Sequence, residues 1–230
     1  MNYNQKIKLA VDAIVFGYRK NELNVLLIQQ GYGQTAGQWA LPGGFVQDGE
    51  ALTEAVQREL LEETSVSVQY LEQLYTFGDQ LDRDPRGRVV TVAYFGIVNP
   101  TGMEIAAGTD AKEANWFPIS EIPDLAYDHK DILAIALKRL QAKLNYQPIG
   151  FDLLDDKFPF SDLENLYRTI LDKDIDRRNF RKKILSFGIL EETNEKRKIG
   201  NGRPAALFKF NKEKYKQLEK EGMSFEIKLA

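Results

Sequence analysis

Hydrophobic residues follow two alternating patterns over the first 145 positions of the chain. Short apolar runs, such as VLLI in the second of them, predict β-strands at 7–18, 24–30, 66–76 and 88–98. Apolar residues three or four positions apart predict amphipathic helices at 53–63 and 131–144. Strands that alternate with helices are typical of an α/β fold, so we expect a sheet covered by helices, an α/β/α sandwich.

Proline, glycine and acidic residues interrupt this periodicity at 145–160. We place a domain boundary there, between domains 1–147 and 155–230. From Asp155 onward the chain has 18 lysines and arginines against 14 aspartates and glutamates, and the rest has 13 against 20. The net charge of −3 therefore combines +4 from Asp155 onward with −7 before it, which indicates two domains with different partners.

The second domain begins with two expected helices. Ser161 to Glu164 fits a capping box that opens the first helix. Asp176 is expected to cap the second helix, which Gly188 ends. The side chains of this helix expected to face inward are Phe180, Ile184, Leu185 and Phe187. Two strands follow, ILEET and AALFKF, so the order predicts a winged helix-turn-helix.

The composition limits the class of protein. The 230 residues include no cysteine, which excludes disulfides, thiolate nucleophiles and zinc–cysteine sites. No apolar run approaches the roughly 20 residues of a membrane span, and the amino-terminal MNYNQKIKLA lacks the apolar core of a signal peptide. We therefore expect a globular, cytoplasmic protein. The single histidine, His129, follows Asp128, an expected helix N-cap, and we interpret it as structural.

The segment 44–66, GFVQDGEALTEAVQRELLEETSV, concentrates carboxylates on one helix face. Glu59, Glu62 and Glu63 are three and four positions apart, so they lie above one another on one side of the helix. Each like-charge pair costs roughly 0.2–0.5 kcal/mol. A bound cation would offset this repulsion, and carboxylate oxygens suit Mg²⁺ or Mn²⁺. A solvated acidic surface is the alternative interpretation.

The spacing in this segment resembles the Nudix box, G-x5-E-x7-R-E-u-x-E-E-x-G-u, in which u is aliphatic. The matching residues are Gly44, Glu50, Arg58, Glu59, Leu60, Glu62, Glu63 and Val66. Ser65 replaces the final glycine, at a position that normally takes a left-handed or otherwise permissive backbone conformation. The resemblance implies a Nudix fold over about the first 145 residues. It also implies metal-dependent hydrolysis of a nucleoside diphosphate linked to another group.

The same resemblance implies roles for individual residues. Glu59 and Glu63 would be the principal Mg²⁺ ligands, with Mn²⁺ as the alternative ion. Glu62 would be a further metal ligand or the group that activates water. Glu50 and Arg58 would support these catalytic carboxylates as an ion pair.

Two further features are candidates for contact with the substrate. Gly43 and Gly44 form a tight turn before the acidic helix, where a phosphate-bearing ligand can approach the backbone. The loop DRDPRGR contributes Arg83, Arg86 and Arg88. Their guanidinium groups are suited to phosphates or to a terminal sugar. A salt-bridged surface loop is the alternative interpretation, and we weigh the two equally.

The second helix of the carboxy-terminal domain and the loop between its strands are basic. The candidate DNA-binding residues are Arg177, Arg178, Asn179, Arg181, Lys182, Lys183, Lys196, Arg197, Lys198 and Arg203. Lysine and arginine would bind phosphates and make binding fall steeply with salt. Asn179 or one of the arginines would read base edges. A solvated basic surface is the alternative, but the helix pair and the wing together favour DNA binding.

A Nudix-like domain followed by this module resembles the Nudix-related transcriptional regulators of bacterial NAD metabolism and sugar catabolism. The resemblance rests on DRDPRGR, LDKDIDRRNFRKKIL and GRPAALFKF beside the box, and it extends to nearly the whole chain. It implies a domain that senses ADP-ribose or a sugar, operator DNA as a partner, and a homodimer. Two hypotheses stay open: a ligand-responsive regulator that can still cleave its effector, and a Mg²⁺-dependent ADP-ribose pyrophosphatase with an accessory domain.

Overall fold

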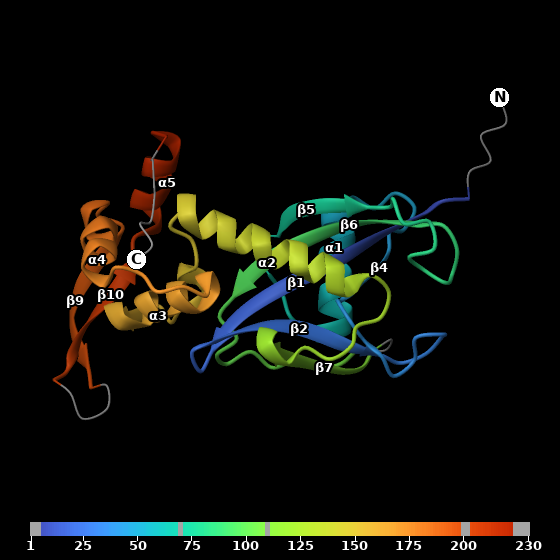
Figure 1. The fold of residues 1–230 in the computed structure, drawn as a ribbon, viewed down its shortest axis with the longest axis horizontal. Helices are drawn as coiled ribbons and strands as arrows, with labels where there is room; N and C mark the ends of the chain where they lie inside the picture. The colour runs from blue at the N-terminus through green and yellow to red at the C-terminus, as the bar shows by residue number, and fades with distance from the viewer. Residues whose placement is uncertain (1–5, 69–70, 109–110, 199–202, 223–230) are drawn as a thin grey trace. The chain divides into compact units, whose positions relative to one another are not determined.

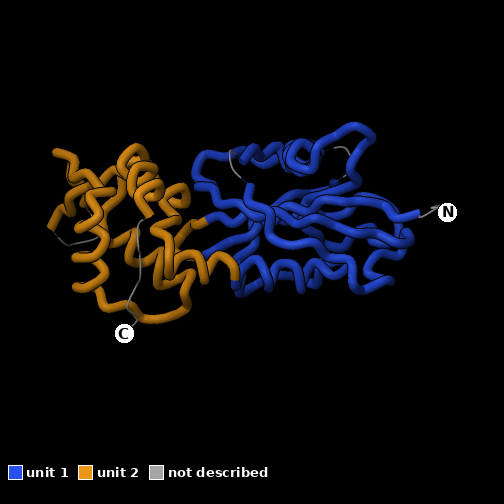
Figure 2. The backbone as a smooth tube through the Cα atoms, turned by 90° about the horizontal axis from the view of Figure 1, so that it is seen from above, with its two compact units in different colours: residues 1–17, 23–138 blue, residues 18–22, 139–230 orange. Residues whose placement is uncertain are grey.

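The chain folds into two compact units. The computed structural model describes residues 6–68, 71–108, 111–198 and 203–222. Unit 1 comprises Met1–Gly17 and Leu23–Lys138, and unit 2 comprises Tyr18–Glu22 and Arg139–Ala230 (Figure 2). Among the described residues, no helix combines the length and the apolar character needed to cross a membrane.

Unit 1 is built on a seven-stranded sheet. Its strands are β1 (Lys8–Arg19), β2 (Glu22–Gln30), β3 (Trp39–Ala40), β4 (Gly43–Phe45), β5 (Glu72–Phe77), β6 (Val89–Val98) and β7 (Ala111–Pro118). Five of them lie in the order β3-β2-β1-β6-β5, while β4 pairs with β1 and β7 with β2. Strands β1 and β6 are parallel, whereas β3, β4, β5 and β7 pair antiparallel with their neighbours. The long strand β1 therefore lies at the centre of a mixed sheet.

Two helices cover the two faces of this sheet (Figure 1). They are α1 (Leu52–Thr64) and α2 (His129–Tyr146), and a short 3-10 helix, η1 (Ile119–Glu121), precedes α2. Side chains alternate between the faces of a strand. Val11 of β1 packs in one apolar cluster with Val56 of α1. The next residue, Asp12, lies near His129 at the start of α2, so α1 and α2 pack against opposite faces.

The expected α/β/α sandwich is confirmed. The predicted strands 7–18, 24–30 and 88–98 correspond to β1, β2 and β6, and the predicted helices 53–63 and 131–144 correspond to α1 and α2. The strand expected at 66–76 begins only at Glu72, and positions 69 and 70 lie outside the described residues. The sequence interpretation missed β3, β4 and β7, because β3 and β4 are very short and polar residues interrupt the apolar pattern of β7.

Unit 2 contains a helix pair and a three-stranded sheet. Its elements are η2 (Phe151–Leu153), β8 (Lys157–Pro159), α3 (Phe160–Leu171), α4 (Arg177–Ser186), β9 (Leu190–Arg197), β10 (Ala205–Phe210) and α5 (Lys212–Lys220). The sheet has the antiparallel order β8-β10-β9. Leu163 and Tyr167 of α3 and Phe180 and Ile184 of α4 are buried. The helix pair followed by β9 and β10 is the predicted winged helix-turn-helix.

Local details of unit 2 confirm one prediction and correct others. Asp176 caps α4 as expected, because its carboxylate accepts a backbone N–H of the first turn at 3.0 Å. The capping box at Ser161 is wrong: α3 begins at Phe160, directly after Pro159, so Ser161 already lies inside the helix. Leu185 was expected to face inward but is 38 % exposed. Strand β8 lies in the stretch expected to interrupt regular structure, where pairing with β10 stabilises it.

Candidate functional site

Gly43 and Gly44, which we expected to form a tight turn, lie instead in strand β4, where pairing with β1 extends the backbone and brings it against the acidic face of α1. The backbone N–H of Gly43 donates to Glu63 Oε2 at 2.8 Å. A side chain at Gly44 would collide with the carboxylate of Glu59, and one at Gly43 would collide with the backbone of β1. Strand β4 therefore approaches both β1 and α1 at distances that only glycine permits.

Arg58 binds three carboxylates of the acidic segment. Its Nε and Nη2 donate to Glu50 at 2.6 and 2.9 Å, and its Nη1 donates to Glu59 at 2.7 Å and to Glu62 at 3.3 Å. The hydrogen bonds from Arg58 lower the pKa of Glu50 to about 2. Burial raises the pKa of Glu59, although Arg58 opposes this shift. The two-point contact with Glu50 makes these residues a supporting ion pair.

The carboxylates of α1 are possible ligands for a metal ion, but their oxygens are not arranged around a single ion position. The described part of the chain contains no group of three or more His, Asp or Glu side chains placed to hold an ion. Arg58 occupies Glu59 and Glu62, and Gly43 donates to Glu63. Their hard oxygens suit Mg²⁺, which takes its remaining ligands from water and substrate phosphates. These carboxylates therefore fit such an ion once Glu59 leaves Arg58 and Glu63 leaves the Gly43 N–H.

Helix α1 ends in the left-handed conformation that we expected at the last glycine position of the Nudix box. Ser65 has φ 59° and ψ 13°, and its N–H donates to Leu61 O at 2.9 Å. A side chain in this region costs roughly 1 kcal/mol relative to glycine. The serine therefore preserves the helix end, but under strain.

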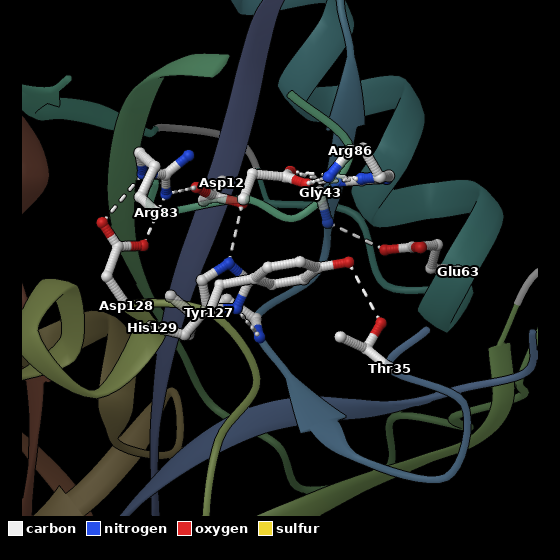
Figure 3. Close-up of polar contacts among 11 residues, drawn as sticks. Asp12, Thr35, Gly43, Glu63, Arg83, Arg86, Tyr127, Asp128 and His129 are labelled. Atoms are coloured by element: carbon white, nitrogen blue, oxygen red, sulfur yellow. Dashed lines mark hydrogen bonds and ion pairs between the residues drawn. The ribbon is translucent and has the colours of Figure 1, made fainter. Parts of the chain in front are cut away.

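Arg83 is buried and forms internal ion pairs (Figure 3). Its Nε and Nη2 donate to the Asp128 carboxylate at 2.8 and 2.6 Å, and Nη2 lies 3.8 Å from Asp12 Oδ2. Asp128 was expected to cap α2, and its carboxylate instead binds this arginine. Arg83 therefore fits the salt-bridged interpretation of the loop better than it fits a free phosphate-binding group.

Arg86 and Arg88 differ from each other. The guanidinium of Arg86 binds Asp84 at 2.7 Å and lies over the rings of Phe45 and Tyr127, 4.7 and 5.2 Å from their centroids. Burial would raise the pKa of Asp84, but hydrogen bonds from Arg86 outweigh it and lower the pKa. Arg88 is not among the described residues that line the cleft with Arg86, and its Nη1 is buried without a hydrogen-bond partner among them.

The acidic helix with Arg58, the glycines of β4 and two arginines of the DRDPRGR loop line one cleft of about 420 Å³ in unit 1. The residues predicted from sequence that it contains are Gly43, Gly44, Arg58, Glu59, Glu62, Glu63, Arg83 and Arg86. Polar lining residues that the sequence interpretation missed or assigned no ligand contact are Asp12, Gln30, Tyr32, Gln47, Asp84, Tyr127 and His129. They come from separate strands and loops, so no local spacing identifies them. The available signal was a charged Asp12 within the apolar strand β1.

His129 makes structural contacts, as we expected, and it also lines the cleft. Its Nδ1 accepts the Leu41 N–H at 2.9 Å, and its Nε2 lies 3.5 Å from Asp12 Oδ1. Burial lowers the pKa of His129. The neutral ring is therefore favoured, with its proton on Nε2.

Three of the candidate DNA-binding residues on α4 are held by neighbours within unit 2. Arg177 donates to the buried Glu164 at 2.8 Å. The Asn179 side-chain amide donates to the capping carboxylate of its own helix at 2.6 Å. The guanidinium of Arg181 lies 4.4 Å from the ring centroid of Phe160. These contacts stabilise the helix pair and reduce what the three side chains can offer to DNA.

Most of the remaining candidate DNA-binding residues of unit 2 are on the surface. Arg178 and Lys182 of α4 are exposed, and Lys183 is half-buried, with its ammonium over the ring of Phe187. The candidate residues of the wing are also exposed, namely Lys196, Arg197, Lys198 and Arg203. Of these, Arg197 also donates to the Lys157 carbonyl at 2.9 Å. Positions 199–202, which include both glycines of the loop, lie outside the described residues.

Comparisons with known proteins match both units. Residues 6–136 match the NUDIX domain, and residues 150–210 match the NrtR DNA-binding winged helix domain. The ADPR responsive transcriptional repressor NtrR of Acinetobacter baylyi is 34% identical over 211 residues, which is 90% of this chain and 83% of the relative. The ADP-ribose pyrophosphatase of Methanocaldococcus jannaschii is 40% identical over 125 residues, 54% of this chain and 70% of that enzyme.

Solved structures give the same result. The NrtR of Shewanella oneidensis in complex with a 27mer DNA is similar with a TM-score of 0.81 and 31% identity, over 96% of this chain and 99% of that one. The NUDIX domain of the same protein, solved with ADP ribose, has a TM-score of 0.56 and 34% identity, over 60% of this chain and 94% of that one. The chain therefore belongs to the Nudix family and, within it, to the proteins that carry an NrtR DNA-binding winged helix domain.

Proposed function

We propose that this chain is a transcriptional repressor whose unit 1 binds ADP-ribose or a close nucleoside diphosphate derivative. Its winged helix would bind operator DNA in the bacterial cytoplasm. The observation that carries the proposal is the combination in one chain of a cleft lined by arginines and Nudix carboxylates with an exposed basic helix and wing. A relative described as an ADPR responsive repressor is similar over both parts.

In this proposal the two parts of the chain have separate tasks. Residues 1–147 form the ligand-binding domain, where Gly43, Gly44 and Arg86 contact the diphosphate. Residues 155–230 form the DNA-binding domain. Its phosphate contacts come from the exposed side chains Arg178, Lys182, Lys196, Arg197, Lys198 and Arg203, with the half-buried Lys183 beside them. A homodimer would place two such helices one helical turn of DNA apart, roughly 34 Å.

A gel-shift titration tests this function. Duplexes from the promoter regions near its own gene should shift at low salt, and the affinity should fall steeply as salt rises, because phosphate contacts release counterions. ADP-ribose added with EDTA, so that it is not cleaved, should release the DNA. If none of these duplexes shifts at low salt, the proposal fails.

A second function, hydrolysis of the bound ligand, is favoured by the retention of Glu59, Glu62 and Glu63 on one helix face. Glu59 and Glu63 would hold Mg²⁺ or Mn²⁺, and Glu62 would be a further ligand or take the proton of the attacking water. When bound, the ion would neutralise the diphosphate and lower the pKa of that water. Arg58 would hold Glu50 and guide the catalytic carboxylates. The contacts of Arg58 with Glu59 and Glu62 suggest that turnover is slow, because they must loosen before an ion binds.

Glu63→Gln tests the hydrolytic activity. The parent should form AMP from ADP-ribose with Mg²⁺, the reaction should stop with EDTA, and Glu63→Gln should abolish it. Glu54→Gln is a matched control on the same helix, since Glu54 is exposed and its carboxylate accepts the Ala51 N–H at the helix start. Activity of Glu63→Gln equal to that of the parent would exclude Nudix chemistry at this site.

A further inference from the structure

One carboxylate in the cleft has an oxygen without a donor. Asp12, near the middle of β1, is 6 % exposed and lines the cleft of unit 1. Its Oδ2 has no hydrogen-bond partner among the described residues. A carboxylate oxygen buried without a donor raises the free energy of the folded protein. A ligand that supplies the donor would remove this cost.

The neighbours of Asp12 leave this oxygen for a ligand. His129 receives the Leu41 N–H on Nδ1, so its Nε2 carries the proton and lies 3.5 Å from Asp12 Oδ1. Arg83 Nη2 lies 3.8 Å from Oδ2, too far for a hydrogen bond. Arg83 is held there because its Nε and Nη2 bind Asp128 at 2.8 and 2.6 Å (Figure 3). The described part of the chain thus places a donor beside Oδ1 and none within hydrogen-bond distance of Oδ2.

Asp12 lies next to the residues that we assign to the diphosphate. It is directly opposite Gly43 in the pairing of β1 with β4, and the N–H of Gly43 binds Glu63 Oε2. A side chain at Gly43 would come within 2.8 Å of Asp12 Oδ1, so the glycine also leaves room for this carboxylate. Gly43 therefore lies between Asp12 on one side and Glu63 of the acidic helix on the other.

The chemistry of Asp12 selects the group that it can receive. A carboxylate accepts hydrogen bonds and repels phosphate oxygens. The group that fits Oδ2 is therefore a neutral donor attached close to the diphosphate. In a nucleoside diphosphate sugar, the ribose hydroxyls meet this description.

We propose, resting on the ligand class proposed above, that Asp12 Oδ2 accepts a hydrogen bond from a ribose hydroxyl beside the diphosphate. Asp12 is then a specificity residue that favours effectors in which this hydroxyl is free. Both riboses of ADP-ribose flank the diphosphate, so the test has to separate them. An effector with a phosphate on the contacted hydroxyl is excluded by charge repulsion.

Asp12→Asn isolates this contact. Asparagine keeps an oxygen for His129 and replaces the accepting Oδ2 by an NH₂ donor. The dissociation constant of ADP-ribose, measured by calorimetry in EDTA, should rise about 10-fold to 100-fold. The melting temperature without ligand should fall only slightly, because the variant loses the 3.8 Å ion pair with Arg83 but Arg83 keeps its two bonds to Asp128. Asp82→Asn, at an exposed position of the arginine loop, should change neither quantity.

ADP-ribose analogues that lack one ribose hydroxyl each identify the contacted group. The analogue without it should bind the parent about as weakly as ADP-ribose binds Asp12→Asn. The variant should not distinguish that analogue from ADP-ribose. An unchanged affinity in Asp12→Asn, or a loss of equal factor for ADP-ribose and for every analogue, overturns the contact while ADP-ribose still binds the parent. Failure of the parent itself to bind ADP-ribose overturns the proposed function, and the hydroxyl contact with it.

Discussion

Ser65 ends α1 with a positive φ of 59°, a conformation that glycine adopts without a clash at Cβ. Ser65→Gly should therefore stabilise unit 1 by about 1 kcal/mol, less the weak contact of the serine hydroxyl with Ala106 O at 3.4 Å. Urea denaturation followed by circular dichroism measures the change. The metal-independent affinity for ADP-ribose should not change, because the carboxylates of α1 lie upstream of this residue.

Gln57→Gly is the control for Ser65→Gly. Gln57 is exposed on the same helix but lies within its right-handed part, where glycine costs roughly 1 kcal/mol. The two substitutions should therefore shift the unfolding midpoint in opposite directions. A loss of stability in both would mean that Ser65 is not strained.

For single residues, the sequence predicted the contacts that depend on residues close by in the chain. Asp176 was assigned as a cap correctly because capping depends on the next three residues. The pairing of Arg58 with Glu50 follows from their positions beside one helix. The surroundings of Asp12 depend instead on the register of β1 with β4 and on the start of α2. Local spacing carries no information about such contacts.

Among elements, α4 combines side chains that stabilise unit 2 with side chains that face solvent. Arg178→Ala should weaken DNA binding by a similar factor for all sequences and reduce the slope of affinity against salt by about 1, because it removes one phosphate contact. Its melting temperature should match that of the parent. Gel shifts over a series of salt concentrations measure both the factor and the slope.

Arg181→Ala is the matched comparison on the same helix. The Arg181 guanidinium lies 4.4 and 5.6 Å from the ring centroids of Phe160 and Phe208. Its removal should therefore cost about 0.5–1 kcal/mol of stability. The salt slope should change less than in Arg178→Ala. Equal slopes for the two variants would show that Arg181 also binds phosphate and that stacking does not divert it.

The elements themselves were predictable where the hydrophobic period is long. Strands β1, β2 and β6 and helices α1 and α2 each have enough apolar positions to define a period. Strands β3 and β4 have two and three residues and form by pairing with β2 and β1. The start of α3 was misplaced because Ser161 to Glu164 matches a capping sequence, whereas Pro159 permits the helix to begin one residue before Ser161.

For the whole molecule, an ADP-ribose-responsive repressor requires a coupling free energy between ligand binding to unit 1 and DNA binding to unit 2. When ADP-ribose weakens DNA binding by a given factor, DNA must weaken ADP-ribose binding by the same factor. Coupling of this kind typically amounts to about 5-fold to 150-fold. Saturating operator DNA should therefore raise the dissociation constant of ADP-ribose within that range.

Calorimetric titration of ADP-ribose into the free protein and into its DNA complex, both in EDTA, measures this factor, and gel shifts measure its counterpart. A factor well above one means that the two units are coupled, whereas a factor of one in both titrations would mean that ADP-ribose does not control DNA binding. With Mg²⁺ the equality applies only while the ligand stays intact, because hydrolysis removes ADP-ribose and restores DNA binding with time. Restoration in the parent, and its absence in Glu63→Gln, would make cleavage the step that ends the signal. Equal persistence in both proteins would assign the carboxylates of α1 to recognition alone.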